Sequence, residues 1–472
     1  MDRSLERLSG LDASFLYLES AAQLMHVCGI VLVDPDTVVG GYSFGKLKSE
    51  LGRRVEAIPA FRRKLKTVPL GIDHPVWVDD ADFDVDRHVH RIAVPAPGGD
   101  AELAELCGHL ASIPLDRSRP LWEMWVVEGL AGSGPEGNAT VAVFTKMHHA
   151  TVDGVSGANL FAFLCSLEPD APLPDVGDDA TVAAEPGSWE LFGRGVLSNL
   201  AKPVDALRLV APTTSLLTRT IRRARAGTAM AAPLTAPRTS FNGTISGRRS
   251  IAFTDIDLER IKQVKRRVEG ATVNDVVLAV SGGALRRYLE SRGELPAQSL
   301  LASVPVSVHD TSTRPGGTNK VSTIFARLGT DLADPRERLE RLARSNANAK
   351  QHHQAIPADT LQDWAHFAAP RVFGLGVRMV SGLKLAERGP VIHNLVISNV
   401  PGPPVPLYFM GARIEALYPL GPVFHGAGLN ITVMSSNNGM HVGLIACRDA
   451  MPDPWQLAQH FAAELDALDR AV

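Results

Sequence analysis

The fold is indicated most clearly by residues 139–154, which have the sequence ATVAVFTKMHHATVDG. Ala139–Met147 is a β-branched, apolar run that predicts a buried strand, and two adjacent histidines, His148 and His149, follow it directly. Asp153 and Gly154 then open an apolar periodic stretch that predicts a helix. Such a junction can hold a side chain rigidly in a cleft, where a neutral imidazole can take a proton from a hydroxyl near pH 7. The segment therefore predicts an active site in a protein of mixed α/β structure.

Strand-like and helix-like segments alternate along the rest of the chain. Ahead of the histidines we expect strands at Met25–Val33, Pro75–Val78 and Leu121–Val127, and helices at Phe44–Leu65 and Ala101–Ile113. Later in the chain we expect strands at Ser250–Thr254, Leu300–Val308 and Val321–Leu328, and helices at Asp257–Val268, Asn274–Ser291 and Asp334–His353. Near the end, Leu429–Met434 and Met440–Cys447 flank Asn438-Gly439, which is typical of a tight hairpin turn.

The length of 472 residues exceeds that of one ordinary hydrophobic core, so we expect two domains. Charge marks the boundary between them. Residues 147–193 contain eight acidic residues and no Lys or Arg, whereas residues 206–254 contain eight Arg and no acid. We predict an N-terminal domain over residues 1–185 with the histidine pair, a linker over 186–245 with amphipathic and Arg-rich helices, and a second domain over 246–472.

The composition, 45% hydrophobic and 21% charged, is that of an ordinary globular protein, and a net charge of −3 gives no general attraction for nucleic acid. Four widely spaced cysteines, without a CxxC pair, predict neither a zinc site nor a disulfide framework. No apolar stretch approaches the roughly 20 residues that span a bilayer, and the charged N-terminus does not look like a signal peptide. We expect a cytoplasmic protein.

The pattern formed by His148, His149, Asp153 and Gly154 resembles HHxxxDG, the active-site signature of the CoA-dependent acyltransferase superfamily. Three further segments look like those of one of its families, the bacterial wax ester synthase/diacylglycerol acyltransferases. They are PLDRSRPLWE at 114–123, NDVVLA at 274–279 and SNVPGP at 398–403. The four motifs occur in the expected order, and the resemblance covers the chain from about Leu8 to its end.

This resemblance implies a fold of two chloramphenicol-acetyltransferase-like open-sheet domains with a tunnel at their interface. It implies an O-acyltransferase that moves a long-chain acyl group from acyl-CoA to diacylglycerol and forms triacylglycerol, without a covalent acyl-enzyme. Acyl-CoA would be a co-substrate, and no cofactor or metal is expected. A long-chain alcohol is the alternative acceptor, which would make the enzyme a wax ester synthase. Either acceptor is a lipid, so we expect contact with the inner face of the membrane or with lipid inclusions.

The resemblance also assigns roles to the motif residues. His149 would be the general base, and His148 would support the loop. Asp153 would hold the loop in shape, and Gly154 would leave room for substrate. Asn274 would orient His149 or stabilise the thioester oxygen as it becomes an oxyanion. Taken alone, the residues also permit plainer roles, since Asp153 and Asn274 suit the start of a helix.

Four residues are expected to bind substrate, namely Pro114, Arg119, Trp122 and Asp275. Asn242 and the pair Arg248-Arg249 correspond to a family segment in which Phe241 replaces a common aliphatic residue, which leaves the acceptor preference open. The arginine-only stretch Arg208–Arg249, beside the apolar stripe Trp189–Leu200, would be either a solvated crossover between domains or a surface for anionic headgroups.

Other enzyme and binding classes compete with acyl transfer. Ser281, in Ala279–Gly283, loosely fits the nucleophile elbow of a serine hydrolase, but it lies within a helical pattern instead of at a strand-to-helix turn. A condensation enzyme acting on carrier proteins is disfavoured by the PLDRSRPLWE segment, and a silent lipid-binding protein by the intact histidine motif. Metal binding is disfavoured because adjacent residues on a strand point to opposite faces.

Overall fold

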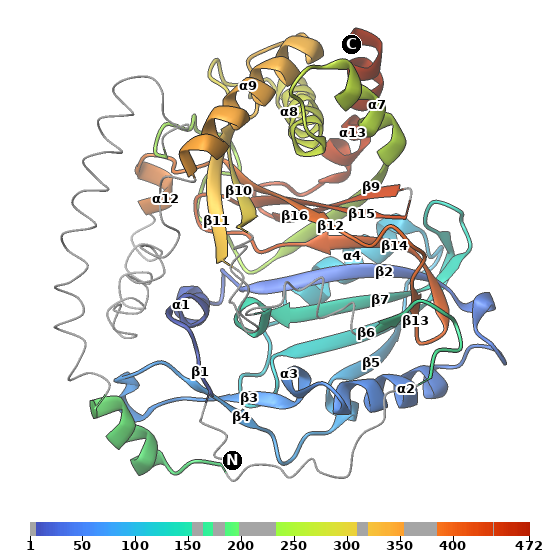
Figure 1. Cartoon of the computed structure of the whole chain (residues 1–472), viewed down its shortest axis with the longest axis vertical. Coiled ribbons are helices and arrows are strands. Elements are labelled where there is room, and N and C mark those ends of the chain that lie inside the picture. Colours follow the sequence, from blue (N-terminus) through green and yellow to red (C-terminus); the bar gives the residue numbers. More distant parts are fainter. Residues whose placement is uncertain are drawn as a thin grey trace.

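The computed structural model describes residues 6–152, 164–172, 185–197, 233–308, 320–353, 385–437 and 439–472. Within these residues the chain forms two large mixed sheets stacked with helices (Figure 1). One group of helices lies above the six-stranded sheet, and α4 lies between the two sheets. Two further helices, α2 and α3, lie below the seven-stranded sheet. The mixed α/β fold of two open sheets predicted for this chain is confirmed.

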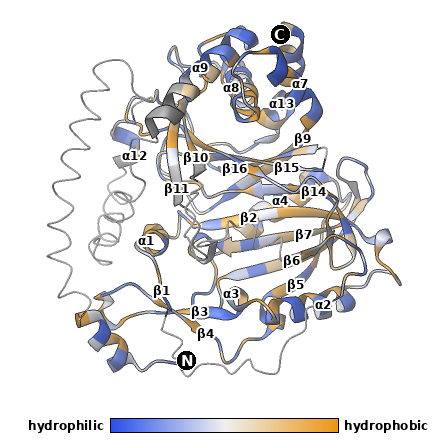
Figure 2. Ribbon diagram, in the orientation of Figure 1, coloured by the Kyte–Doolittle hydropathy of each residue, from blue (hydrophilic) through white to orange (hydrophobic). Residues whose placement is uncertain are grey.

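The seven-stranded sheet carries the histidine pair. Its order is β5-β6-β7-β2-β14-β13-β8, with β5 and β6 parallel and every other neighbouring pair antiparallel. The strands are β2 (His26–Asp34), β5 (Val89–Ala93), β6 (Trp122–Ser133), β7 (Ala139–His148), β8 (Cys165–Ser166), β13 (Tyr408–Phe409) and β14 (Ala412–Leu420). One face packs on α2 (Phe44–Glu56) and α3 (Pro59–Arg62), and the other on α4 (Asp100–Ala111). Strands β2, β6 and β7 therefore contribute apolar side chains to the cores on both faces. In Figure 2, much of β2 and β7 has the hydrophobic colour.

The six-stranded sheet has the order β11-β10-β12-β15-β16-β9. Its strands are β9 (Arg249–Asp257), β10 (Leu301–Val308), β11 (Lys320–Arg327), β12 (Leu395–Pro401), β15 (Leu429–Ser436) and β16 (Gly439–Cys447). One face is covered by α7 (Leu258–Arg267), α8 (Val273–Ser291), α9 (Pro335–His353) and α13 (Trp455–Ala471), which share its largest hydrophobic core. β15 and β16 form the antiparallel hairpin predicted on either side of Asn438-Gly439.

Two strands from the C-terminal half belong to the N-terminal sheet. β14 pairs with β2 from Arg413 opposite Asp34 to Leu420 opposite Cys28, and β13 pairs with β8. The prediction of a separate domain over residues 246–472 did not include this exchange of strands, in which β13 and β14 join the sheet of the other domain. An uncovered edge of β2 would leave backbone N–H and C=O groups unpaired, and β14 satisfies them. The exchange joins the two halves of the chain through backbone hydrogen bonds.

The two sheets also approach each other through α4 and β14. A Cβ atom on Gly108 of α4 would lie 2.9 Å from the carbonyl oxygen of Arg249, at the start of β9. A Cβ atom on Gly443 of β16 would collide with the carbonyl oxygen of Pro419 in β14. These positions require glycine because the backbones are in direct contact. Across the same interface, the hydroxyl of Tyr418 donates to Asp255 at 2.8 Å.

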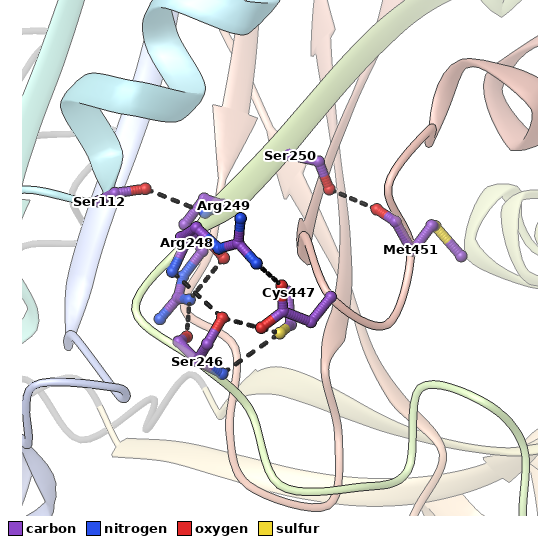
Figure 3. A network of polar contacts seen from close by, with 8 residues as sticks. Ser112, Ser246, Arg248, Arg249, Ser250, Cys447 and Met451 are labelled. Atoms are coloured by element: carbon purple, nitrogen blue, oxygen red, sulfur yellow. Dashed lines mark hydrogen bonds and ion pairs between the residues drawn. The ribbon is translucent and has the colours of Figure 1, made fainter.

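The segment around Arg249 forms a second connection between the halves (Figure 3). The Arg249 backbone N–H donates to the Ser112 hydroxyl at 2.9 Å, and the Arg249 guanidinium donates to the carbonyls of Ala22 and Ser246. Asn242 is buried and donates to the carbonyls of Asn394 and Gly426, both at 2.8 Å. The Arg249 contacts with Ser112 and Ala22 join the two halves, whereas the Asn242 contacts attach the end of the linker to the second domain.

The helix predicted over Phe44–Leu65 is wrong beyond residue 56. The chain forms α2 to Glu56, then the short helix α3 from Pro59, then strand β3 (Arg63–Lys66). Pro59 cannot continue a helix because it has no N–H, but it suits the first position of a new one. β3 joins β4 (Val76–Asp79) and β1 (Glu6–Arg7) in a small antiparallel sheet. Further helices are α1 (Gly10–Leu18), α12 (Leu385–Arg388) and residues 188–197.

Candidate active site

His148 is the last residue of β7, and its side chain is only 1% exposed. Pairing with His26 of β2 fixes its backbone. The N–H of Ala150 donates to His148 Nδ1 at 3.0 Å, so in the neutral ring the proton is on Nε2. That nitrogen lies 3.3 Å from a carboxylate oxygen of Glu19, the residue that follows α1. His148 therefore lies inside the protein between a turn and a helix end.

His149 begins a 3-10 turn, η4 (His149–Val152), directly after β7. Its backbone N–H donates to the carbonyl of Met25 at 2.8 Å, and its ring lies against the Phe15 ring of α1, with centroids 3.9 Å apart. The side chain is half-buried. Burial, together with the neighbouring His148, lowers the pKa of His149 to about 4. The imidazole is therefore neutral at pH 7, which is the state that a general base needs.

The PLDRSRPLWE segment reaches this site through Arg117. Arg117 donates from Nε to Glu19 Oε2 at 3.0 Å, and from Nη2 to the same oxygen and to the carbonyl of Leu16. Burial raises the pKa of Glu19, but its contacts with His148 and Arg117 outweigh this effect and lower the pKa to about 2. Glu19 is therefore an ionised carboxylate shared by His148 and Arg117.

The NDVVLA and SNVPGP segments meet each other in the second domain. Asn399 of β12 donates from its side-chain amide to the Asn274 side-chain oxygen, a long contact of 3.5 Å. Asn274 is the second residue of α8, whose N-cap is Thr272. The contact orients the Asn274 amide, because its oxygen end faces Asn399.

Comparison with known proteins identifies the family. A family model described as the wax ester synthase/diacylglycerol acyltransferase catalytic domain matches residues 8–277, and the C-terminal domain model of the same family matches residues 317–469. The chain belongs to the wax ester synthase/diacylglycerol acyltransferase family. It is therefore an acyltransferase, as the motifs predicted.

Relatives and solved structures agree with this assignment. A Mycobacterium tuberculosis (strain CDC 1551) protein named as a diacylglycerol O-acyltransferase is 46% identical over 98% of this chain and 90% of its own length. The wax ester synthase/diacylglycerol acyltransferase from Marinobacter aquaeolei VT8 superposes with a TM-score of 0.69 at 30% identity, over 98% of this chain and 99% of that one. The first condensation domain of the calcium-dependent antibiotic synthetase shares the fold, with a TM-score of 0.54 at 14% identity, over 99% and 98% of the two chains.

The four residues predicted to bind substrate are not brought together by their described contacts. Pro114 and Arg119 lie at the surface, where Arg119 is 3.5 Å from Asp116. Trp122 is buried in the core, and its indole N–H donates to the carbonyl of Phe61 at 2.8 Å. Asp275 is also buried, and its two carboxylate oxygens accept from Thr272 and from Asn346, which attaches the start of α8 to α9. By these contacts, Trp122 and Asp275 have structural roles in this acyltransferase.

Several predicted residues lie outside the part of the chain that the structure describes. Among the motif residues these are Asp153 and Gly154. The arginines at 208, 219, 222, 223 and 225 and the end of the Trp189–Leu200 stripe are also outside it. The roles assigned to them remain predictions.

Ser281, the nucleophile of the hydrolase alternative, lies inside α8 and is fully buried. Its hydroxyl donates to the carbonyl of Val277 at 2.8 Å, as serines within helices do. A nucleophile needs a neighbouring base and access to substrate. The described contacts give Ser281 neither.

Ser281→Ala is therefore expected to keep most of the acyl transfer activity. The change removes one hydrogen bond within α8, and direct acyl transfer does not use the Ser281 hydroxyl. Turnover of acyl-CoA by the purified variant, together with intact-mass spectrometry of the wild-type protein during turnover, checks this expectation. An acyl adduct on Ser281 would contradict it and favour the hydrolase.

Within the described residues, no group of three or more His, Cys, Asp or Glu side chains is arranged to hold a metal ion. Burial raises the pKa of the Cys28 thiol to about 12, so this cysteine is protonated at neutral pH. None of the helices that the structure describes is both long and apolar enough to cross a bilayer.

Sequence reasoning did not find Phe15 of α1 or Glu19, the residue that follows α1, although both contact the histidines. Glu19 could only have been singled out as an acid at the end of a helix, which is a common surface arrangement. Glu19 reaches His148 only because α1 packs against η4, and these two segments are far apart in the sequence.

Proposed function

We propose that this acyltransferase moves a long-chain acyl group from acyl-CoA to diacylglycerol and forms triacylglycerol. The observation that carries the proposal is the placement of His149. A neutral, half-buried imidazole directly follows a rigid strand, and a second histidine beside it is fixed by protein contacts. The relative at 46% identity is named as a diacylglycerol O-acyltransferase, and this name supports the choice of acceptor. We expect acyl-CoA as co-substrate and no other cofactor.

In the proposed reaction the acceptor hydroxyl attacks the thioester carbonyl directly. His149 takes the hydroxyl proton while the new C–O bond forms, and the carbonyl oxygen becomes an oxyanion. The C–S bond then breaks, and the CoA sulfur leaves with the proton from the imidazolium. Because Asn399 faces the oxygen end of the Asn274 amide, the NH₂ end is the one that could donate to an oxyanion. No acyl group is attached to the protein at any step.

A competition assay tests the acceptor. Purified protein is given labelled palmitoyl-CoA with diacylglycerol and hexadecanol together, and the products are separated by lipid chromatography. Triacylglycerol as the main product supports the proposal. Wax ester as the main product would make a long-chain alcohol the acceptor, and free palmitate alone would contradict acyl transfer.

The pH dependence of kcat/KM provides a further prediction. A base must be neutral, and His149 loses its neutral form only as the pH falls through about 4, instead of through the ordinary histidine value of 6.5. Activity should therefore stay nearly constant as the pH falls from 7 to about 5.5 and decline below that. Rates with a short soluble alcohol, with circular dichroism at each pH, provide the measurement. A decline centred near pH 6.5 in the folded protein would contradict a base with a lowered pKa.

We also propose that the acceptor is collected at a lipid surface, either the inner face of the membrane or a lipid inclusion. Residues 188–197 are helical, and this helix is amphipathic. Leu191 is 2% exposed and packs on Val68, Val76 and Val78, whereas Trp189 is 85% and Leu197 69% exposed. An exposed Trp and Leu on one helix suit insertion at a headgroup boundary.

A further inference from the structure

We infer that Glu19 is a positioning residue for acyl transfer, which holds the histidine pair through His148 and connects it to the PLDRSRPLWE segment through Arg117. The inference rests on the proposed function, because it assumes that His149 is the base. It assigns a part to Glu19 and to Arg117 that the motifs alone do not reveal.

One helix contacts both histidines. Phe15 belongs to α1 and Glu19 is the C-cap that directly follows it, so the two residues are four positions apart on the same side of the helix end. The Phe15 ring packs on the His149 ring, and the Glu19 carboxylate lies 3.3 Å from His148 Nε2. The position of α1 therefore fixes the base and its neighbour together.

The polar contacts form a continuous chain from the surface to the turn that carries the base. Arg117, about half exposed, donates twice to Glu19 Oε2. The same oxygen faces His148 Nε2, and His148 Nδ1 accepts from the Ala150 N–H. The Thr151 hydroxyl donates to the His148 carbonyl at 2.7 Å. His149 lies between His148 and Ala150, so this chain fixes the backbone on both sides of the base.

The carboxylate also selects the tautomer of His148. An ionised carboxylate only accepts hydrogen bonds, so the His148 nitrogen that faces it must carry the proton. The other nitrogen is then free of a proton and can accept from Ala150. In the opposite tautomer two N–H groups would face each other inside the protein, and the turn would lose its hydrogen bond. Glu19 thus determines the geometry of η4 without touching the reacting atoms.

The test compares Glu19→Gln with a matched control, Glu128→Gln. Glu128 accepts from two nitrogens of Arg91, at 2.9 and 2.7 Å, and from the Tyr42 hydroxyl at 2.7 Å. Like Glu19 it is paired with an arginine, but its other partner is a tyrosine instead of a histidine. It lies opposite Val141, near the other end of β7. For Glu19→Gln we expect kcat to fall by about 10- to 100-fold, as for a misplaced catalytic group, with the KM for acyl-CoA nearly unchanged. Glu128→Gln should keep the wild-type kcat.

A double variant tests whether Glu19 acts through His148. If it does, Glu19→Gln combined with His148→Ala should be no slower than His148→Ala alone. Independent losses that multiply in the double variant would overturn the inference, as would wild-type kcat in a folded Glu19→Gln protein or an equal fall in the Glu128→Gln control.

Arg117→Gln provides a second variant at a more exposed position, in case Glu19→Gln does not fold. A fall in kcat at unchanged KM supports the inference, and a rise in KM with unchanged kcat would instead make Arg117 a substrate contact and overturn it. His149→Ala distinguishes a failure of the proposed mechanism from a failure of the role inferred for Glu19. If that variant stays active, the proposed mechanism fails. If it is inactive while Glu19→Gln has wild-type kcat, only the role of Glu19 fails.

Discussion

Replacement of His149 with alanine is expected to slow acyl transfer by about 10²- to 10⁴-fold, the usual effect of losing a general base. The folded structure should survive, because the His149 backbone N–H that donates to Met25 is retained and the side chain is only half-buried. Turnover of palmitoyl-CoA with diacylglycerol provides the rate. Binding of palmitoyl-CoA, measured by calorimetry, should remain close to that of the wild-type protein.

The neighbouring histidine serves as the control for this experiment. His148→Ala should cost less activity than His149→Ala, because His148 acts through the geometry of the turn. Near-wild-type turnover by a folded His149→Ala protein would rule out the general-base mechanism. A larger loss in His148→Ala than in His149→Ala would exchange the roles of the two residues.

Replacement of Glu464 with alanine is expected to destabilise the second domain by about 3–5 kcal/mol, the cost of leaving a buried charge without its partner. Glu464 of α13 and Arg338 of α9 are each 2% exposed and form a direct ion pair, and Arg287 of α8 donates to the same carboxylate at 2.7 Å. One acid therefore joins three of the helices that cover the six-stranded sheet. For a domain of this size the loss corresponds to a fall in Tm of roughly 6–20 °C, measured by calorimetry.

Two variants show whether burial is the cause. Glu290→Ala removes a carboxylate that is 60% exposed and lies 3.5 Å from Arg286 on α8, and it should cost at most about 0.5 kcal/mol. Arg338→Met combined with Glu464→Leu removes both buried charges and should recover most of the stability. Equal Tm shifts for Glu464→Ala and Glu290→Ala would contradict the prediction.

Local sequence patterns predicted the elements whose structure depends on neighbouring residues. The apolar, β-branched runs Met25–Val33 and Ala139–Met147 correspond to β2 and β7, and the two strands predicted around the Asn438-Gly439 dipeptide form an antiparallel pair. Hydrophobic periodicity and turn chemistry act over a few residues, so they can be recognised without the fold. The same reasoning missed the break at Pro59, where the apolar pattern continued past a residue that ends a helix.

The histidine motif and the family were determined by the sequence, because the residue types and spacing that carry the chemistry are local. The tertiary structure decided which groups surround that motif. Packing of α1 brings Phe15 and Glu19 to the histidines, and β14 reaches the edge of β2 from the other half of the chain. The neutral state of His149 is likewise a result of burial, which no sequence pattern expresses. Loss of water around a side chain depends on segments distant in sequence, so these features arise only when the whole chain packs.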